Sequence, residues 1–314
     1  MIRLSELYNG WTNFFFVEQP SSVIGLFRIC MGLIIFIDSL FLFRSSGLCF
    51  GTNGTFPLIY WKISGFKNRF SLFRYLCESD EPVYITMVAM IISSFLFTIG
   101  FYTQLSSIVL FICWLSLTHR NVYIYHSGDT LCRLFIFLSM FSCAGYGLSL
   151  DNYINSRDQL YTMNSVWCQR LIMIQLTIVY WFAVFFKLKS NDWLEGSAIY
   201  YSLLNCTVGR KLVGPTFLKK LCTGLRLSSW LALAMEIFIG FGAWFYETRY
   251  IAIWLGICFH IFLEMNFRLG TFSWVMCAGL LLFLDPYDTS RFLESMYSCL
   301  QNNLSYIDIW GWFS

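Results

Sequence analysis

Charged residues are scarce in this sequence. They make up 12% of its 314 residues, whereas soluble domains carry about a quarter. So little charge leaves too little polar surface for a water-soluble particle, and the composition also excludes a disordered chain, a collagen and a coiled coil. The net charge of +3 is too small to indicate a polyanionic partner, so we expect no nucleic acid to bind.

The signatures of soluble enzymes and metal sites are also missing. The sequence contains no Walker loop, no G-x-G-x-x-G, no G-x-S-x-G and no H-E-x-x-H, so it gives no sign of the sites that those motifs build. No C-x-x-C occurs among the 12 cysteines, and we expect neither a metal nor a thioredoxin-like pair. Cys206 and Cys222 flank a polar stretch and could pair if that loop faces an oxidising compartment.

Apolar residues, in contrast, are abundant: 57% of the chain is hydrophobic and 20% is aromatic. This composition predicts an all-α, polytopic integral membrane protein that lies in a lipid bilayer, the cell membrane if the source is bacterial. A membrane span needs about 20 predominantly apolar residues. About eight runs approach that length, and they are Ser22–Phe43, Pro82–Tyr102, Leu105–Thr118, Leu131–Leu148, Val166–Phe186, Leu227–Tyr246, Tyr250–Phe267 and Thr271–Leu284.

Two other stretches resemble helices that lie on the membrane surface. Residues 56–77 mix aromatic and basic side chains. After Asp285, apolar residues recur every three to four positions, which predicts an amphipathic interfacial helix over residues 287–314. Its apolar positions are Phe292, Met296, Leu300, Leu304 and Ile307, and its anchors are Trp310, Trp312 and Phe313. The expected organisation is therefore a transmembrane bundle over residues 1–286 followed by this helix.

The loops allow a prediction of membrane orientation. With eight spans, both termini lie on one side, and the loops 44–81 and 189–226 lie on the other and carry most of the Lys and Arg. The positive-inside rule then places these loops in the cytoplasm and both termini outside.

Ionisable side chains within spans are costly, so each is a candidate functional residue. A guanidinium is poorly tolerated facing lipid, so we expect Arg28 to face the bundle interior. There it would contact a polar cavity or an acidic group, for which Asp38 and Glu236 are the candidates. The alternative is that Arg28 and Asp38 each extend to the nearer interface. Glu236 has no cation at helical spacing and needs a partner from another helix.

Two other pairs of ionisable residues give weaker indications of a functional site. Asp129 and Arg133 are four residues apart, which favours a local ion pair. His260 and Glu264 share one helix face, but a packing hydrogen bond explains them better than a metal site that lacks a third ligand.

Lys187 is the most informative residue. It ends the run IVYWFAVFFKLK, in which Tyr180 and Trp181 can exclude water from the lysine amine. A lysine against aromatic walls loses hydration, which favours the neutral amine and makes it a usable base. The alternative is a lysine that extends to the interface from a helix end.

Four stretches together resemble one family, the HTTM (horizontally transferred transmembrane) domain, which includes the membrane part of vitamin K-dependent gamma-glutamyl carboxylase. They are SSVIGLFRICMGLIIFID, HSGDTLCRLFIFLSMFSCAGYGLSLD, RLIMIQLTIVYWFAVFFKLKSNDWLEGSAIYY and CFHIFLEMNFRLGTFSWVM. The third is the strongest, with an apolar helix followed by K-L and W-x-E-G. The resemblance runs from about residue 13 to residue 286.

The resemblance implies a role for several residues. Lys187 falls on the base that deprotonates vitamin K hydroquinone, in a reaction that carboxylates a glutamate side chain. His260 falls on a family histidine, His126 is an approximate counterpart of another, and Trp193 and Glu195 belong to the W-x-E-G segment. The implied cofactor is a reduced quinone, and the implied substrate is a peptide or a small molecule.

Two departures from the carboxylase are visible. The carboxylase has a large domain after its helices, whereas about 30 residues follow the last apolar run here. Its catalytic side is also luminal and its N-terminus cytosolic, the reverse of the orientation that the loop charges predict.

Two other functions remain open. Some small bacterial proteins of this type resemble components of peptide-toxin maturation systems, which favours a non-catalytic membrane partner that works with a small protein. A transporter is disfavoured because the two halves show no inverted repeat.

Overall fold

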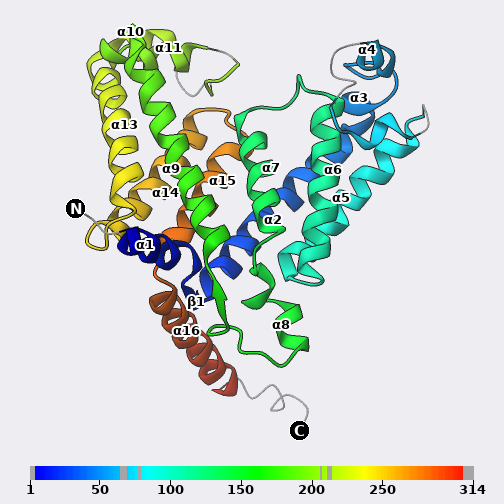
Figure 1. Ribbon diagram of the computed structural model, residues 1–314. Coiled ribbons are helices and arrows are strands. Elements are labelled where there is room, and N and C mark those ends of the chain that lie inside the picture. The colour runs from blue at the N-terminus through cyan, green and yellow to red at the C-terminus, as the bar shows by residue number, and fades with distance from the viewer. Residues whose placement is uncertain (1–3, 64–68, 77–78, 206, 211–213, 307–314) are drawn as a thin grey trace.

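The computed structural model describes residues 4–63, 69–76, 79–205, 207–210 and 214–306 (Figure 1). The first half of the described chain contains α1 (Leu4–Phe16), β1 (Glu18–Pro20), α2 (Ser22–Arg44), α3 (Ser46–Phe50), α4 (Leu58–Ile63), η2 (Leu72–Arg74), α5 (Glu81–Ile99), α6 (Thr103–Arg120), α7 (Ser127–Ser139), η3 (Ala144–Tyr146) and α8 (Leu150–Ile154). The second half contains β2 (Met163–Ser165), α9 (Trp167–Leu188), α10 (Asn191–Leu194), α11 (Ala198–Leu204), α12 (Pro215–Lys220), α13 (Cys222–Gly242), α14 (Arg249–Asn266), α15 (Thr271–Leu280), η4 (Leu281–Phe283) and α16 (Pro286–Tyr306).

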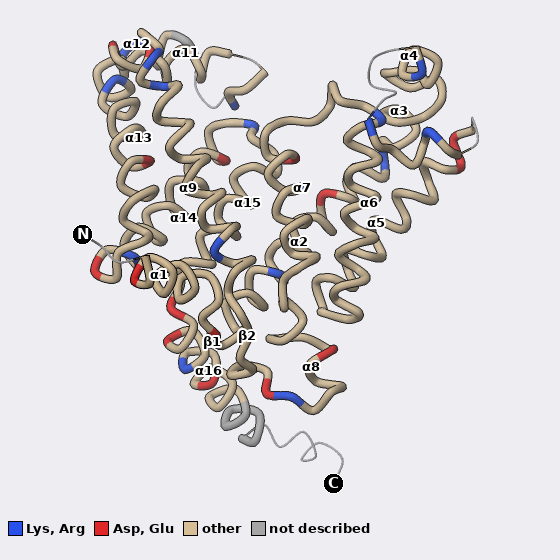
Figure 2. Tube along the Cα trace, in the orientation of Figure 1, with Lys and Arg blue, Asp and Glu red and all other residues tan. Residues whose placement is uncertain are grey.

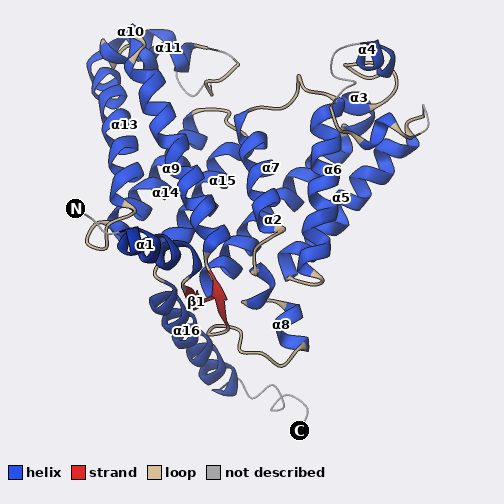
Figure 3. Ribbon diagram, viewed as in Figure 1, coloured by secondary structure: helices blue, strands red, loops and turns tan. Residues whose placement is uncertain are grey.

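The fold is all-α apart from one small strand pair, which the sequence did not predict (Figure 3). β1 and β2 are antiparallel, with Glu18 opposite Ser165 and Pro20 opposite Met163. The pair joins the chain before α2 to the chain before α9. α1 is a further helix that the apolar pattern did not indicate.

Each of the eight apolar runs is largely helical, as expected. Four of these helices, α2, α5, α9 and α13, are long and apolar enough to cross a membrane by length and composition. This supports a membrane protein, and a total of about eight spans stays a prediction. α2 and α5 pack closely because Gly32 has no side chain: a Cβ there would lie 2.9 Å from the Thr98 Cα.

The run Leu131–Leu148 is not one helix. α7 ends at Ser139, and the chain turns through η3 before α8. The reason lies in α2: Arg28 is fully buried, and its guanidinium donates to the carbonyl oxygens of Ala144 at 2.8 Å and Leu148 at 2.6 Å. These carbonyl oxygens accept hydrogen bonds from a guanidinium instead of from the backbone N–H groups of a continuing α-helix.

Arg28 therefore faces the interior, as predicted, but its predicted partners were wrong. Neither Asp38 nor Glu236 contacts it; carbonyl oxygens do, and the acid whose charge acts on it is Asp151. Asp151 itself accepts the N–H groups of Tyr102 and Thr103, both at 2.8 Å.

Charged residues gather toward the two ends of the bundle (Figure 2). The upper end in Figure 1 carries α3, α4 and α10–α12, and the lower end carries α1, α8, β1, β2 and α16. The described parts of the loops 44–81 and 189–226 therefore lie at the same end. Which membrane side each end faces stays a prediction.

The surface segments are only partly described. α4 and η2 form short helices within 56–77, where 64–68 and 77 lie outside the described residues. α16 is helical, and Phe292, Met296 and Leu300 are exposed along it. Ile307 and the anchors Trp310, Trp312 and Phe313 lie outside the described residues, as does Cys206, so its pairing with Cys222 is untested.

Candidate functional site

The last turn of α9 and the middle of α13 are joined by an ion pair. Lys187 Nζ lies 2.5 Å and 2.6 Å from the two carboxylate oxygens of Glu236. The lysine side chain is 20% exposed and the glutamate side chain 8%. Both groups are thus largely removed from water, and the partner that Glu236 requires comes from another helix, as the sequence indicated.

A cavity of about 500 Å³ opens beside this pair. Its walls come from the end of α9, from α10, α11, α13 and α14, from Val208 and from the turn before α15. They are mainly apolar and include Trp193, Met235, Phe259, Phe262 and Phe267. Lys187 lines the cavity, and its Nζ also lies 4.5 Å from the ring centroid of Trp193. One amine therefore faces an apolar space of the size that small-molecule sites have.

A second buried polar pair lies deeper in the bundle. The Tyr180 hydroxyl and His260 Nε2 are 2.8 Å apart, and both side chains are almost fully buried. The charge of Lys187 acts on His260, although neither Tyr180 nor His260 is among the residues that line the cavity. His260 Nδ1 is buried without a hydrogen-bond partner among the described residues.

A short segment, residues 207–210, lies along one side of the cavity and is called the strap here. Gly209 forms an isolated β-bridge with Phe267, and Val208 and Phe267 both line the cavity. Arg210 fixes the strap because its Nη2 lies 2.6 Å from Glu264 Oε1. Glu264 therefore pairs with the strap and not with His260 four residues earlier.

His126 lies outside the cavity. It is the N-cap of α7, where its Nδ1 accepts the Gly128 N–H at 3.1 Å. Asp129 completes this cap by accepting the His126 N–H at 2.8 Å. The predicted ion pair of Asp129 with Arg133 was wrong, because the carboxylate is used by the cap and by Thr271, while Arg133 approaches His119.

The remaining sequence candidates lie elsewhere. Trp181 packs edge-on against Phe241 at 4.2 Å and is 37% exposed. Glu195 is exposed, and Arg28 is not among the residues that line the cavity. Within the described residues, no group of three or more His, Cys, Asp or Glu side chains could hold a metal ion.

Sequence reasoning missed the strap and most of the cavity wall. The apolar residues of α13 and α14 that face the cavity look like any other residues of a span. The Arg210–Glu264 pair joins positions 54 residues apart, which no local pattern reveals.

Comparison with known proteins agrees with this architecture. Residues 16–287 match the HTTM domain. The chain is 26% identical over 140 residues to the sporulation-delaying protein SdpB of Bacillus subtilis (strain 168), covering 43% of each chain. It is also 26% identical over 124 residues to the uncharacterized protein YitO of the same organism, covering 38% of this chain and 40% of that one. These matches span less than half the length of either relative, and no solved structure matches.

Proposed function

The chain belongs to the HTTM domain family, and from this premise we propose that it is a quinol-linked membrane enzyme. It modifies a peptide or a small substrate by proton abstraction, with Lys187 as the base. The observation that carries the proposal is the position of Lys187, whose amine faces an apolar cavity of about 500 Å³ and is paired with one buried carboxylate.

The cavity residues fit a reduced quinone. Phe259, Phe262 and Phe267 supply apolar walls for a ring and its tail, and Trp193 closes the wall beside the amine. Among the described residues that line the cavity, Lys187 alone is charged, so a hydroxyl group would be oriented toward it. A bound reduced quinone would supply the acidic hydroxyl and two electrons, and dioxygen would be the co-reactant that accepts these electrons.

Glu236 explains how a paired lysine acts as a base. A base must offer a free amine, and an ammonium beside a carboxylate does not. Transfer of the Lys187 proton to the Glu236 carboxylate, whose Oε1 lies 2.5 Å from Nζ, would free the Nζ lone pair for a hydroxyl within hydrogen-bond reach. Glu236 would then hold that proton during the reaction.

The matched pair Lys187 and Lys189 tests the proposal. Lys189 is two residues away and lies over the Phe185 ring at 4.1 Å, outside the cavity. We expect Lys187→Ala and Lys187→Arg to abolish quinol-dependent modification, the latter because arginine does not release its proton, while Lys189→Ala keeps it. The measurement compares the turnover of vitamin K hydroquinone in the presence and in the absence of oxygen. It uses purified protein supplied with cell-derived peptides. Full activity of folded Lys187→Ala would contradict the proposal.

A second function is favoured by the similarity to SdpB. In this alternative the chain is a non-catalytic membrane component of a peptide maturation system and works with a small partner protein. The Lys187–Glu236 ion pair then has only a structural role, which is to hold α9 against α13. Retained peptide maturation in cells that carry Lys187→Ala, together with no quinone in the purified protein, would favour this reading.

A further inference from the structure

Arg170 lies in the first turn of α9, at the lower end of the bundle and far from Lys187 in the last turn. Its guanidinium has no strong acceptor within the part of the chain that the structure describes. Nη1 lies 3.9 Å from the Met173 sulfur, a weak acceptor. The group stacks over Phe14 at 5.1 Å, and Nε is buried without a partner. A guanidinium is always charged and carries five donors.

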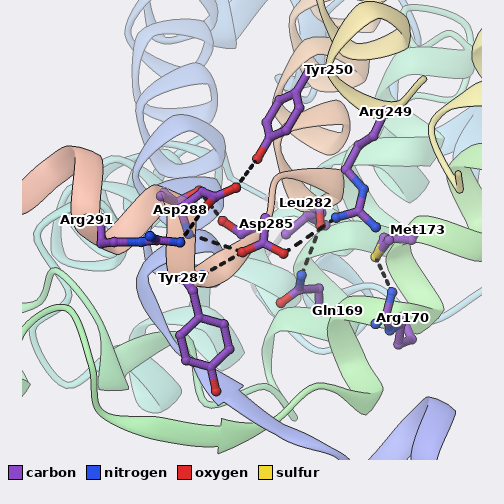
Figure 4. Close-up of polar contacts among 11 residues, drawn as sticks. Gln169, Arg170, Met173, Arg249, Tyr250, Leu282, Asp285, Tyr287, Asp288 and Arg291 are labelled. Atoms are coloured by element: carbon purple, nitrogen blue, oxygen red, sulfur yellow. Dashed lines mark hydrogen bonds and ion pairs between the residues drawn. The ribbon is translucent and has the colours of Figure 1, made fainter. Parts of the chain in front are cut away.

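A second cation stands next to it. Arg249 is the first residue of α14, and Figure 4 shows its guanidinium and that of Arg170 on neighbouring positions. The charge of Arg249 acts on Arg170, and the Arg249 Nε is also buried without a partner in the described chain. Two cations so placed repel each other unless an anion lies between them.

The acids of this region are already engaged. Arg249 Nη1 is 3.7 Å from Asp285, longer than a charge-assisted hydrogen bond of about 2.7–2.9 Å. The other Asp285 oxygen accepts the N–H groups of Tyr287 and Asp288. Asp288 accepts from Tyr250 at 2.8 Å and from Arg291 at 2.7 Å (Figure 4). Within the described ranges, Arg170 is left with no carboxylate of its own.

The surroundings are those of a membrane interface. α1 lies against this end of α9, and its Tyr8 and Trp11 are 67% and 62% exposed. Trp244 stacks on Phe14 at 6.0 Å. Exposed Trp and Tyr side chains gather at the level of lipid headgroups, so the two arginines lie where headgroup phosphates are present.

We propose that Arg170 and Arg249 bind the phosphate of an anionic phospholipid headgroup between α1, α9 and α14. The planar guanidinium matches two phosphate oxygens at once, and a phosphodiester between the two groups replaces their repulsion by attraction. The ligand is a phosphate ester, and a lipid supplies it because Phe14, Trp11 and Tyr8 offer an adjacent apolar surface for its chains.

The test uses the full-length protein purified in detergent and titrated with short-chain phosphatidylglycerol, short-chain phosphatidylcholine or inorganic phosphate. The readout is the unfolding temperature followed by tryptophan fluorescence. We expect phosphatidylglycerol to stabilise the wild type more than the other two. Arg170→Gln should weaken the apparent affinity for phosphatidylglycerol about tenfold, the effect of one charge-assisted hydrogen bond.

Arg291→Gln is the matched control, since Arg291 is 70% exposed and pairs with Asp288 on its own helix; it should bind as the wild type does. If Arg170→Gln does not fold, Arg170→Lys replaces it, because lysine keeps the charge but lacks the planar guanidinium. This variant should still bind phosphatidylglycerol more weakly than the wild type. Unchanged affinity in the folded variant overturns the proposal. Equal stabilisation by inorganic phosphate overturns the lipid as the source.

Discussion

Lys187 of α9 and Glu236 of α13 form an ion pair with an Nζ–Oε1 distance of 2.5 Å across positions 49 residues apart in the chain. The pair joins two of the helices that are long enough to span a membrane, and it does so at the edge of the cavity. Its chemistry and its contribution to stability can therefore be separated by mutation.

Breaking the pair should destabilise the protein more than removing it. Lys187→Met or Glu236→Leu alone leaves one buried charge unpaired, which costs about 3–5 kcal/mol, whereas the double variant removes both charges. We expect both single variants to lower the unfolding temperature and the double variant to recover most of the loss. A double variant no more stable than the worse single variant would show that the pair is not coupled. Chemical or thermal unfolding in one detergent gives all four values.

A quinone in the cavity should protect Cys258 from alkylation. Cys258 lines the cavity and is exposed, and Cys222 is exposed but lies outside the cavity. N-ethylmaleimide should label both, and a vitamin K quinone with a fully substituted quinone ring should slow labelling of Cys258 alone. Peptide-level mass spectrometry measures the two rates. Equal slowing at both sites, or at neither, would argue against a quinone in this cavity.

Replacement of Arg28 should destabilise the fold. Arg28→Ala leaves the buried carbonyls of Ala144 and Leu148 without donors, at about 1–3 kcal/mol each. Arg28→Lys keeps the charge but has a compact ammonium that cannot reach both carbonyls at once. We expect the order wild type, Lys variant, Ala variant in unfolding temperature. A fully stable Arg28→Ala protein would mean that these contacts contribute nothing.

Gly100 should tolerate no side chain. Its φ is +70°, and a Cβ there would lie within 2.5 Å of the Ser149 Cβ and still closer to the Arg28 guanidinium. Gly100→Ala should therefore be strongly destabilising. Gly224→Ala is the matched control, because that glycine lies in a helix with nothing within 4 Å of a Cβ, and it should be neutral or slightly stabilising. Expression and unfolding temperature compare the two.

The sequence predicted the features that depend on composition and on the periodic spacing of apolar residues. The apolar runs and the interior position of Arg28 both follow from the properties of single segments. The partners of Arg28 could not be predicted, because they are backbone carbonyls and any residue supplies a carbonyl. The end of α7 at Ser139 depends on the same contacts, so the run Leu131–Leu148 was predicted to be too long a helix.

The site was predictable in part for the same reason. Lys187 could be singled out because a lysine after an aromatic run is unusual, and Glu236 because it lacked a local partner. The pairing itself, the cavity and the strap arise from contacts between distant helices. The assignment of Lys187 as a base rests on the resemblance and stays a prediction.

The two cations of α9 also set a limit on the membrane around the protein. Arg170 and Lys187 are 17 residues apart, which is about 25 Å along a helix. The hydrocarbon layer is usually about 30 Å thick, so if Arg170 lies among the headgroups, Lys187 lies near the far edge of that layer. Its pairing with Glu236 lowers the cost of this depth, and local thinning of the bilayer would lower the cost further. Hydrophobic mismatch at α9 thus favours thin membranes, and the protein should be most stable and most active in bilayers of short-chain lipids.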